Sequence, residues 1–147
     1  MKACHLKSWS KTSVLIFLIL LFSCNDQSTE PDEMNPLIGT WVISKMTSVS
    51  LGETEIFDAP QLEEMGVIWC YTFKDDHTVE QITNISGSLL TMPGTWSVSG
   101  NQLTLILVGP NGTPGTLEYE YSIENDVLKL NWQIPAGPEF FAEFKKS

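Results

Sequence analysis

Arginine is absent from this sequence of 147 residues. All eight basic residues are lysines, and 18 acidic residues outnumber them, so the formal net charge is −10 at pH 7. A surface of this charge repels phosphate backbones and anionic lipid headgroups. The composition therefore argues against binding to nucleic acid and against electrostatic docking to a membrane.

A hydrophobic run long enough to cross a membrane is also missing. The longest apolar run covers residues 14–22, well short of the roughly 18 to 20 residues that a spanning helix needs. It follows the positively charged Lys2, Lys7 and Lys11 and precedes the small residue Ser23. This three-part arrangement predicts a secretory signal peptide at residues 1–23.

The end of the apolar run carries a more specific pattern. Leu21-Phe22-Ser23-Cys24 resembles the lipobox of bacterial lipoproteins, with leucine at −3 and a small residue before the cysteine that receives the lipid. The resemblance implies cleavage before Cys24, acylation of Cys24, and anchoring at the bacterial envelope, with the outer membrane as the expected location. Durable attachment needs more than one acyl chain, which the multiply acylated cysteine of this family would supply.

Cleavage at this point would leave 124 residues, enough for one domain, with five lysines and a net charge of about −13. Few cysteines would remain, because Cys4 is removed and Cys24 is acylated. A disulfide framework is thereby excluded. Cys70 is interpreted as a small buried hydrophobe on a strand, since a nucleophile would need a base and the one remaining histidine, His77, lies in an apparent turn.

Residues 24–35 have no apolar period and contain four acids, which predicts a flexible acidic tether before a domain at residues 36–147. The acids after Cys24 also resemble the surface-export signals of Bacteroidetes lipoproteins.

Beyond the tether, short alternating apolar and polar runs separated by turn residues indicate an all-β domain. Trp41, Ile43 and Val49 share one side of the first run, and the alternation is weakest in the third. One short helix is expected at residues 59–65, where Pro60 suits the first turn. The predicted strands cover residues 39–49, 67–73, 78–85, 95–99, 102–108, 116–123, 127–132 and 139–145.

About eight strands in hairpin order leave two exposed edges unless the first strand pairs with the last. The sequence therefore predicts a small up-and-down β-barrel with at most one short helix.

Three motifs resemble a known family. Gly39-Thr40-Trp41 looks like the glycine-x-tryptophan motif that opens the first strand of lipocalins. The whole of residues 36–147 is similar to lipocalin-like domains of Bacteroidetes lipoproteins, through this motif, the turn of residues 73–78 and the second motif Gly94-Thr95-Trp96. His77 stands where that family usually has glycine, and the arginine that covers the lipocalin tryptophan cannot be present. The resemblance implies a lipocalin-like barrel that binds a small apolar ligand.

Aromatic residues dominate the predicted inward positions, and two interpretations stay open. A gap at the barrel mouth would admit a small apolar ligand, whereas a filled barrel would act as a protein–protein interaction module through its acidic exterior or the loop at residues 109–115. The candidate ligand-lining residues are Trp41, Trp69, Tyr71, Phe73, Trp96, Tyr119, Tyr121 and Trp132.

Residues that could act as nucleophile, base or metal ligand are few in the predicted domain. One histidine and one cysteine are too few for a zinc site or a nucleophile–base pair. We therefore expect no cofactor, no metal and no enzymatic activity.

Acylation of Cys24 is directly testable. Mass spectrometry of the native protein should show an acylated N-terminal Cys24, and Cys24→Ala should give uncleaved or unanchored protein because no thiol remains to accept the lipid. An intact Met1 on the membrane-bound wild-type protein would contradict the assignment.

Overall fold

The computed structural model describes residues 35–84 and 87–147, so the predicted signal peptide, Cys24 and the tether before residue 35 lie outside the described residues. Within them, no helix is long and apolar enough to cross a membrane. The elements are β1 (Gly39–Ser50), β2 (Glu53–Asp58), α2 (Ala59–Glu64), β3 (Trp69–Phe73), β4 (Thr78–Thr83), β5 (Leu90–Ser99), β6 (Gln102–Val108), β7 (Pro114–Glu124), β8 (Val127–Gln133) and β9 (Glu139–Lys146).

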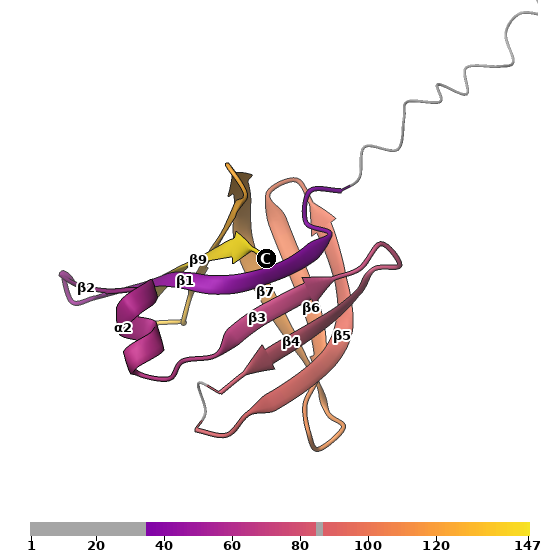
Figure 1. Ribbon diagram of the computed structural model, residues 1–147, viewed down its shortest axis with the longest axis horizontal. Helices are drawn as coiled ribbons and strands as arrows, with labels where there is room; N and C mark the ends of the chain where they lie inside the picture. The colour runs from indigo at the N-terminus through magenta and orange to yellow at the C-terminus, as the bar shows by residue number, and fades with distance from the viewer. Residues whose placement is uncertain (1–34, 85–86) are drawn as a thin grey trace, which may run out of the picture. The chain divides into compact units, whose positions relative to one another are not determined.

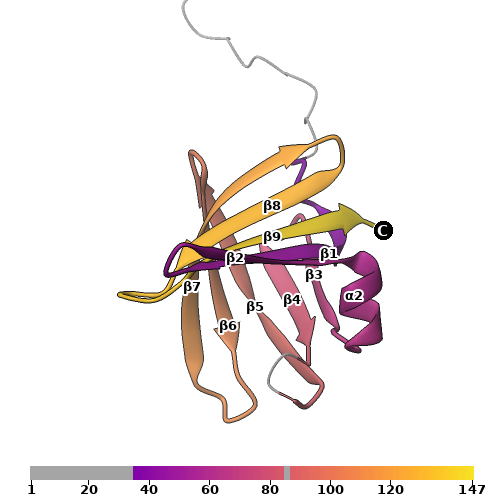
Figure 2. The same cartoon turned by 90° about the vertical axis from the view of Figure 1, so that its left-hand side faces the viewer.

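Eight of these strands close into an antiparallel barrel, as the sequence predicts. From β3 to β9 each strand pairs with the next one along the chain, and β1 pairs with both β3 and β9. The ladder between the first and last strands runs from Trp41 opposite Lys146 to Val49 opposite Glu139. Figure 2 shows β8, β9 and β1 running across the direction of β4, β5 and β6. Closure removes the two edges that an open sheet would leave unpaired.

The two ends of the barrel differ. The turn end carries the tight connections β3–β4, β5–β6 and β7–β8, which place His77, Asn125 and Asp126 at positive φ. His77 has φ 62°, so the turn predicted there forms with histidine in the left-handed region. The opposite end, here called the loop end, carries the longer connections β4–β5, β6–β7 and β8–β9 together with α2 (Figure 1).

β1 has three partners. One edge pairs with β9 along most of its length, whereas the other edge pairs with β3 from Gly39 to Val42 and with β2 from Lys45 to Ser50. β2 is therefore a ninth strand that lies outside the closed barrel. The sequence did not predict it, because all its side chains except the half-buried Phe57 are exposed and no apolar alternation marks it.

A register shift in β1 corrects one prediction. The pairing with β9 slips between Ile43 and Lys45, and the Ser44 hydroxyl donates a hydrogen bond to the Glu143 carbonyl over 3.0 Å. An extra residue reverses the side on which the following side chains lie. Met46 consequently packs against the core, and the prediction that Val49 continues the face of Trp41 and Ile43 is wrong.

The first glycine-x-tryptophan motif closes the turn end. Trp41 is fully buried, its indole N–H donates to the Leu37 carbonyl over 2.7 Å, and the Lys146 ammonium lies 5.2 Å from the ring centroid. A lysine from the last strand thus covers one face of the indole. Gly39 has φ 132°, and a Cβ there would meet Lys146 Cε at 2.8 Å. The positive φ favours glycine here, whereas the flexible end of the Lys146 side chain could move aside from a Cβ.

The second glycine-x-tryptophan motif also combines a buried indole with a glycine, and it too lies at the turn end. The Trp96 indole donates to the Lys74 carbonyl over 3.1 Å, and its ring lies 4.9 Å from that of His77. A Cβ at Gly94 would come within 2.0 Å of the Ile106 carbonyl oxygen, so the close approach of β5 to β6 needs glycine.

Removal of the first indole should be costly. Trp41→Ala is expected to lower the free energy of unfolding by about 3 to 5 kcal/mol, since it deletes a large buried aromatic group. Urea denaturation measures this, with the exposed outer-face change Ile106→Ala as the control. A loss below about 1 kcal/mol would show that the turn end is not closed by Trp41.

Candidate functional site

The barrel interior is aromatic over most of its height. Near the turn end, Trp41, Phe73 and Trp96 are buried and form its closed floor. Nearer the loop end, Trp69 packs edge-on against Trp132 with ring centroids 5.8 Å apart. Trp132 in turn stacks on Phe140 at 5.2 Å, and both of these rings remain half-buried. Aromatic surface of Trp132 and Phe140 is therefore accessible toward the loop end.

A polar cluster lies within this aromatic interior. Tyr71 on β3 and Gln81 on β4 are direct cross-strand partners, and the Gln81 amide nitrogen donates to the Tyr71 hydroxyl over 3.0 Å. The Tyr71 and Tyr119 hydroxyls are hydrogen-bonded at 3.2 Å. Gln81 Oε1 is buried without a hydrogen-bond partner, and the buried Trp69 indole adjoins the Tyr71 hydroxyl, whose pKa it lowers. We call these four residues the polar node.

Burial dominates the electrostatics of the node. It raises the pKa of Tyr71 well above the usual tyrosine value, and the neighbouring Tyr119 adds to the rise. Burial likewise raises the pKa of Tyr119, against a lowering effect of its hydrogen bond with Tyr71. Both phenols stay protonated at physiological pH, so the node is neutral.

An apolar cleft opens in the barrel wall where β1 leaves β3. The last pair between these strands is Val42 opposite Cys70, and β1 then turns to β2 while α2 spans the gap (Figure 1). The cleft has a volume of about 340 Å³, and Glu63 is the only charged residue in its lining. We call it the side cleft; it is lined by Val42, Ile43, Ala59, Leu62, Glu63, Val67, Ile68, Trp69 and Cys70.

The helix that bounds the side cleft is fixed by its first turn. The Asp58 side chain accepts from the Gln61 backbone N–H over 3.3 Å, and Gln61 Oε1 accepts from the Asp58 N–H over 3.0 Å. This reciprocal capping box, with Pro60 in the first turn, begins the helix. Leu62 is thereby directed inward and is 2% exposed.

Cys70 lies on a strand between Trp69 and Tyr71, as the sequence predicts, but it is less buried than expected. Its neighbours Trp69 and Tyr71 face the interior, so Cys70 lies on the other side of β3, only half-buried, in the side cleft. The prediction of a buried cysteine is therefore wrong. Burial nevertheless raises the pKa of the thiol, against the lowering effect of the Ile82 backbone, which disfavours the nucleophilic thiolate.

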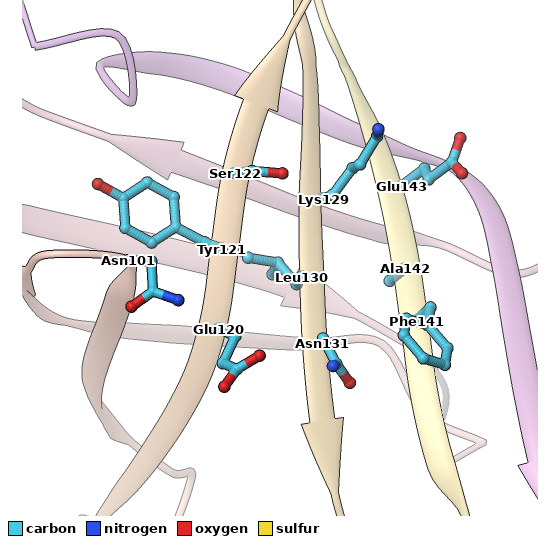
Figure 3. Close-up of a pocket in the computed structure, with 10 residues that line it drawn as sticks. All are labelled: Asn101, Glu120, Tyr121, Ser122, Lys129, Leu130, Asn131, Phe141, Ala142 and Glu143. Atoms are coloured by element: carbon cyan, nitrogen blue, oxygen red, sulfur yellow. The ribbon is translucent and has the colours of Figure 1, made fainter.

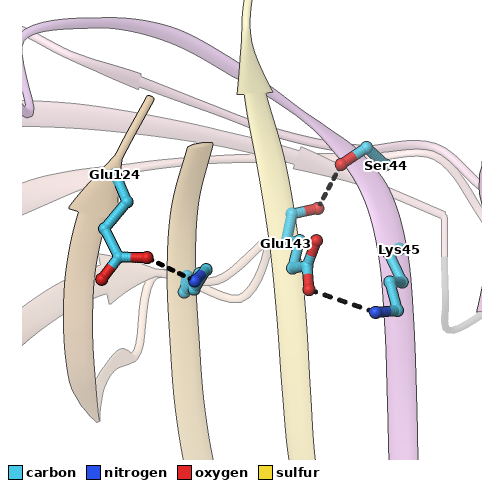
Figure 4. Close-up of polar contacts among 5 residues, drawn as sticks. Ser44, Lys45, Glu124 and Glu143 are labelled. Atoms are coloured by element: carbon cyan, nitrogen blue, oxygen red, sulfur yellow. Dashed lines mark hydrogen bonds and ion pairs between the residues drawn. The ribbon is translucent and has the colours of Figure 1, made fainter. Parts of the chain in front are cut away.

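A second concavity lies on the outer face of β7, β8 and β9 (Figure 3). It has a volume of about 350 Å³ and contains two cross-strand rows, Glu120–Asn131–Phe141 and Ser122–Lys129–Glu143. Ion pairs hold the charged side chains, with Lys129 2.7 Å from Glu124 and Lys45 3.3 Å from Glu143 (Figure 4). Its lining mixes charged and polar side chains with apolar ones such as Phe141, whereas that of the side cleft is mainly apolar.

The structure divides the predicted ligand-lining residues into three groups. Trp41, Phe73 and Trp96 form the closed floor. Tyr121 is half-buried near the turn end, where it packs against the core, and it also borders the concavity beside Asn101 (Figure 3). Only the remaining four come together around the polar node, and these are Trp69, Tyr71, Tyr119 and Trp132.

Gln81 and most of the side-cleft residues were missed by sequence reasoning. The weak alternation of residues 78–85 was the available signal for Gln81, because the inward positions of β4 are Val79, Gln81 and Thr83. The cleft had no such signal, since it depends on β1 leaving β3. Within residues 35–84 and 87–147, no three His, Cys, Asp or Glu residues are grouped to hold a metal ion.

A closed antiparallel barrel with hairpin connectivity defines the class of up-and-down β-barrels, which includes the lipocalins. A family model described as the lipocalin-like domain matches residues 37–131, and the chain belongs to this family. No curated protein matches the sequence.

Two solved structures from Bacteroides share the fold. One is a lipocalin-like protein from Bacteroides uniformis ATCC 8492, similar with a TM-score of 0.52 and 20% identity over 77% of this chain and 100% of that chain. The other is an uncharacterized protein from Bacteroides eggerthii DSM 20697, with a TM-score of 0.50 and 14% identity over 76% and 99% of the two chains.

The buried tyrosines should make stability depend on pH in the alkaline range. Because their folded-state pKa values are raised, the folded protein keeps phenol protons that the unfolded chain loses above about pH 10. The free energy of unfolding should therefore be unaffected by these groups below pH 10 and should fall as pH rises above it. Urea denaturation across this range tests the expectation.

Tyr71→Phe should reduce the alkaline fall because it removes one of the two raised groups. An identical pH dependence in wild type and Tyr71→Phe would contradict the burial of an ionisable phenol at the node.

Proposed function

We propose that this protein is a lipid-anchored lipoprotein of the bacterial envelope that binds a small apolar molecule without catalysing a reaction. The observation that carries the binding proposal is the side cleft. Its volume of about 340 Å³ lies at the lower end of the range of about 300 to 1,000 Å³ for small-molecule sites. Membership of the lipocalin-like family supports the same conclusion.

Hydrophobic burial would supply most of the affinity. The cleft is lined by aliphatic side chains and by Trp69, which also belongs to the interior aromatic group. Apolar surface removed from water contributes roughly 25 cal/mol per Å². Since Glu63 is the only charged residue in the cleft lining and an apolar ligand carries no charge, screening by salt should change the affinity little.

A non-catalytic role follows from the chemistry available at the cleft. Cys70 is its one thiol, and the pKa of Cys70 is raised. His77, which could act as a base, lies at the turn end against Trp96. The described residues thus do not assemble a nucleophile–base pair at the cleft.

The envelope location rests on the sequence alone. Acylation of Cys24 would anchor the protein in a lipid bilayer, with the outer membrane as the proposed site, and residues 24–35 would link the anchor to Leu37 and the closed floor.

Partial filling of the cleft tests the binding proposal. Val42→Phe adds bulk to the side cleft, whereas Val108→Phe makes the same change on the outside of β6; the two valines are similarly exposed, at 44% and 37%. An apolar ligand identified by quenching of tryptophan fluorescence should bind at least tenfold more weakly to Val42→Phe and unchanged to Val108→Phe.

Circular dichroism and urea denaturation confirm that both variants are folded. Failure of fatty alcohols, sterols, quinones and haem-like compounds to give saturable quenching, together with salt-sensitive capture of a protein, would support the interaction module instead. Equal affinities in the two phenylalanine variants would refute the cleft as the site.

A further inference from the structure

β2 lies outside the closed barrel, and its outer edge is free. Among the described residues it pairs only with β1, from Ser50 opposite Glu53 to Lys45 opposite Asp58. The register is continuous, and the strand contains no proline and no lysine. Figure 1 shows this hairpin extending away from β3, β4 and β5. Exposed edges are usually blunted by bulges, prolines or lysines, so β2 keeps a complete edge for pairing.

The turn of the hairpin determines which backbone groups face β1. Leu51 and Gly52 connect the two strands, and both have positive φ, 52° and 82°. Positive φ at both central residues is typical of the two-residue hairpin turn that matches the twist of the strands. The residues that flank such a turn, here Ser50 and Glu53, form a hydrogen-bonded pair. The backbone groups of Glu53 are therefore used within the hairpin.

The next residues present their backbone to the free edge. Hydrogen-bonded and non-hydrogen-bonded pairs alternate along an antiparallel ladder, so the N–H and C=O groups of Thr54 and Ile56 point away from β1. The Asp58 N–H, two residues further on, follows the same alternation, and Gln61 Oε1 accepts it. Thr54 and Ile56 are exposed. Their four backbone groups are thus available to an added strand.

The side chains on one face of β2 are acidic. Glu53 and Glu55 lie opposite Ser50 and Ser48 on β1, and neither takes part in the ion pairs of the described residues. Together with these serines and Leu51 they line a concavity of about 280 Å³. Carboxylate and hydroxyl oxygens accept hydrogen bonds from an ammonium group. The concavity therefore suits the end of a lysine side chain.

A second copy of β2 does not suit this edge. Each copy carries Glu53, Glu55 and Asp58 and has no basic residue. Two copies side by side would bring acids of both strands together, and like charges across a strand pair are unfavourable. The same charges favour a strand of opposite sign, so charge complementarity selects a basic partner over self-association.

Pairing geometry also determines the sequence pattern of that partner. Its residues opposite Thr54 and Ile56 would form the hydrogen-bonded pairs, with side chains on the face of Ile56, which is 53% exposed. Its residue opposite Glu55 would lie in a non-hydrogen-bonded pair, where side chains approach most closely, on the face of the carboxylates. The edge therefore fits apolar residues that alternate with basic ones.

We propose that the free edge of β2 is a docking site for an extended segment of a partner protein in which apolar and basic residues alternate. The segment adds a strand to the sheet, with basic side chains beside Glu53 and Glu55 and apolar side chains against Ile56. β2 does not line the side cleft. The docking site is therefore separate from the apolar-ligand site and goes beyond the proposed function.

A peptide of alternating valine and lysine tests the edge. Binding of the fluorescein-labelled peptide to the full chain is measured by fluorescence anisotropy, and it should be saturable and weaken as salt is added. The matched valine–glutamate peptide should not bind. Backbone N-methylation of the valines removes the N–H groups that face β2 and should abolish binding. Backbone N-methylation of the lysines, whose N–H groups face away, should preserve it.

Charge reversal locates the site. The double variant Glu53→Lys/Glu55→Lys should bind the peptide at least about tenfold more weakly, because attractive cross-strand contacts become repulsive. Glu118→Lys/Glu120→Lys makes the same change in net charge at exposed positions of β7, a strand with both edges paired, and should have a much smaller effect. Ile56→Pro removes an outward N–H without removing a β1–β2 hydrogen bond, and it should also weaken binding.

Circular dichroism first confirms that the variants are folded. Equal binding of the two methylated peptides, equal affinities in the two charge-reversed variants, or absence of saturable binding to the wild type would each overturn the inference. A dimer in sedimentation equilibrium that Ile56→Pro abolishes would assign the edge to a second copy and would overturn it as well. The side cleft is tested separately by the Val42→Phe comparison, which does not depend on β2.

Discussion

Pairing of the first strand with the last is the constraint on which the rest of this structure depends. It closes the sheet, and it also brings Lys146 on β9 over the face of Trp41 on β1. The first strand begins at Gly39, whose φ of 132° favours glycine. The cation over this indole is available only because the first and last strands of the domain are adjacent. The strand pairing that closes the barrel thus also completes the aromatic floor, because it brings Lys146 onto Trp41.

The same pairing generates the side cleft. Because β9 occupies one edge of β1, the other edge must serve both β3 and β2, and these partners diverge after Val42. A barrel whose first strand paired with β3 throughout would have a continuous wall. The departure of β1 leaves an apolar gap, and α2, held by its capping box with Leu62 directed inward, covers it only in part. The candidate site is therefore a consequence of topology rather than of a local motif.

The features that alternation of apolar and polar residues encodes were predicted correctly from the sequence. The features that depend on how the strands pair were missed. The barrel, α2 and the inward aromatic residues follow from period-two patterns and turn residues. Val49 was misplaced because a bulge at Ser44 reverses the side chains after it, and a bulge has no signature in hydrophobicity. β2 was missed because almost all of it is exposed. The burial of Cys70 was overestimated because burial was assigned by residue type, whereas its flanking residues Trp69 and Tyr71 already take the inward side of β3.

Gln81 shows how a weak pattern can be informative. A strand that folds into an apolar interior gains most by presenting apolar residues, so a glutamine at an inward position lowers stability unless both ends of its amide are paired. Here one end pairs with Tyr71 and the other has no partner. A leucine or methionine would fit the same period without that cost, and stable cores commonly use them. The chain therefore keeps, at an inward position of β4, an amide of which the fold pairs only the nitrogen, and this polar group rather than an apolar contact sets the weak alternation of the strand.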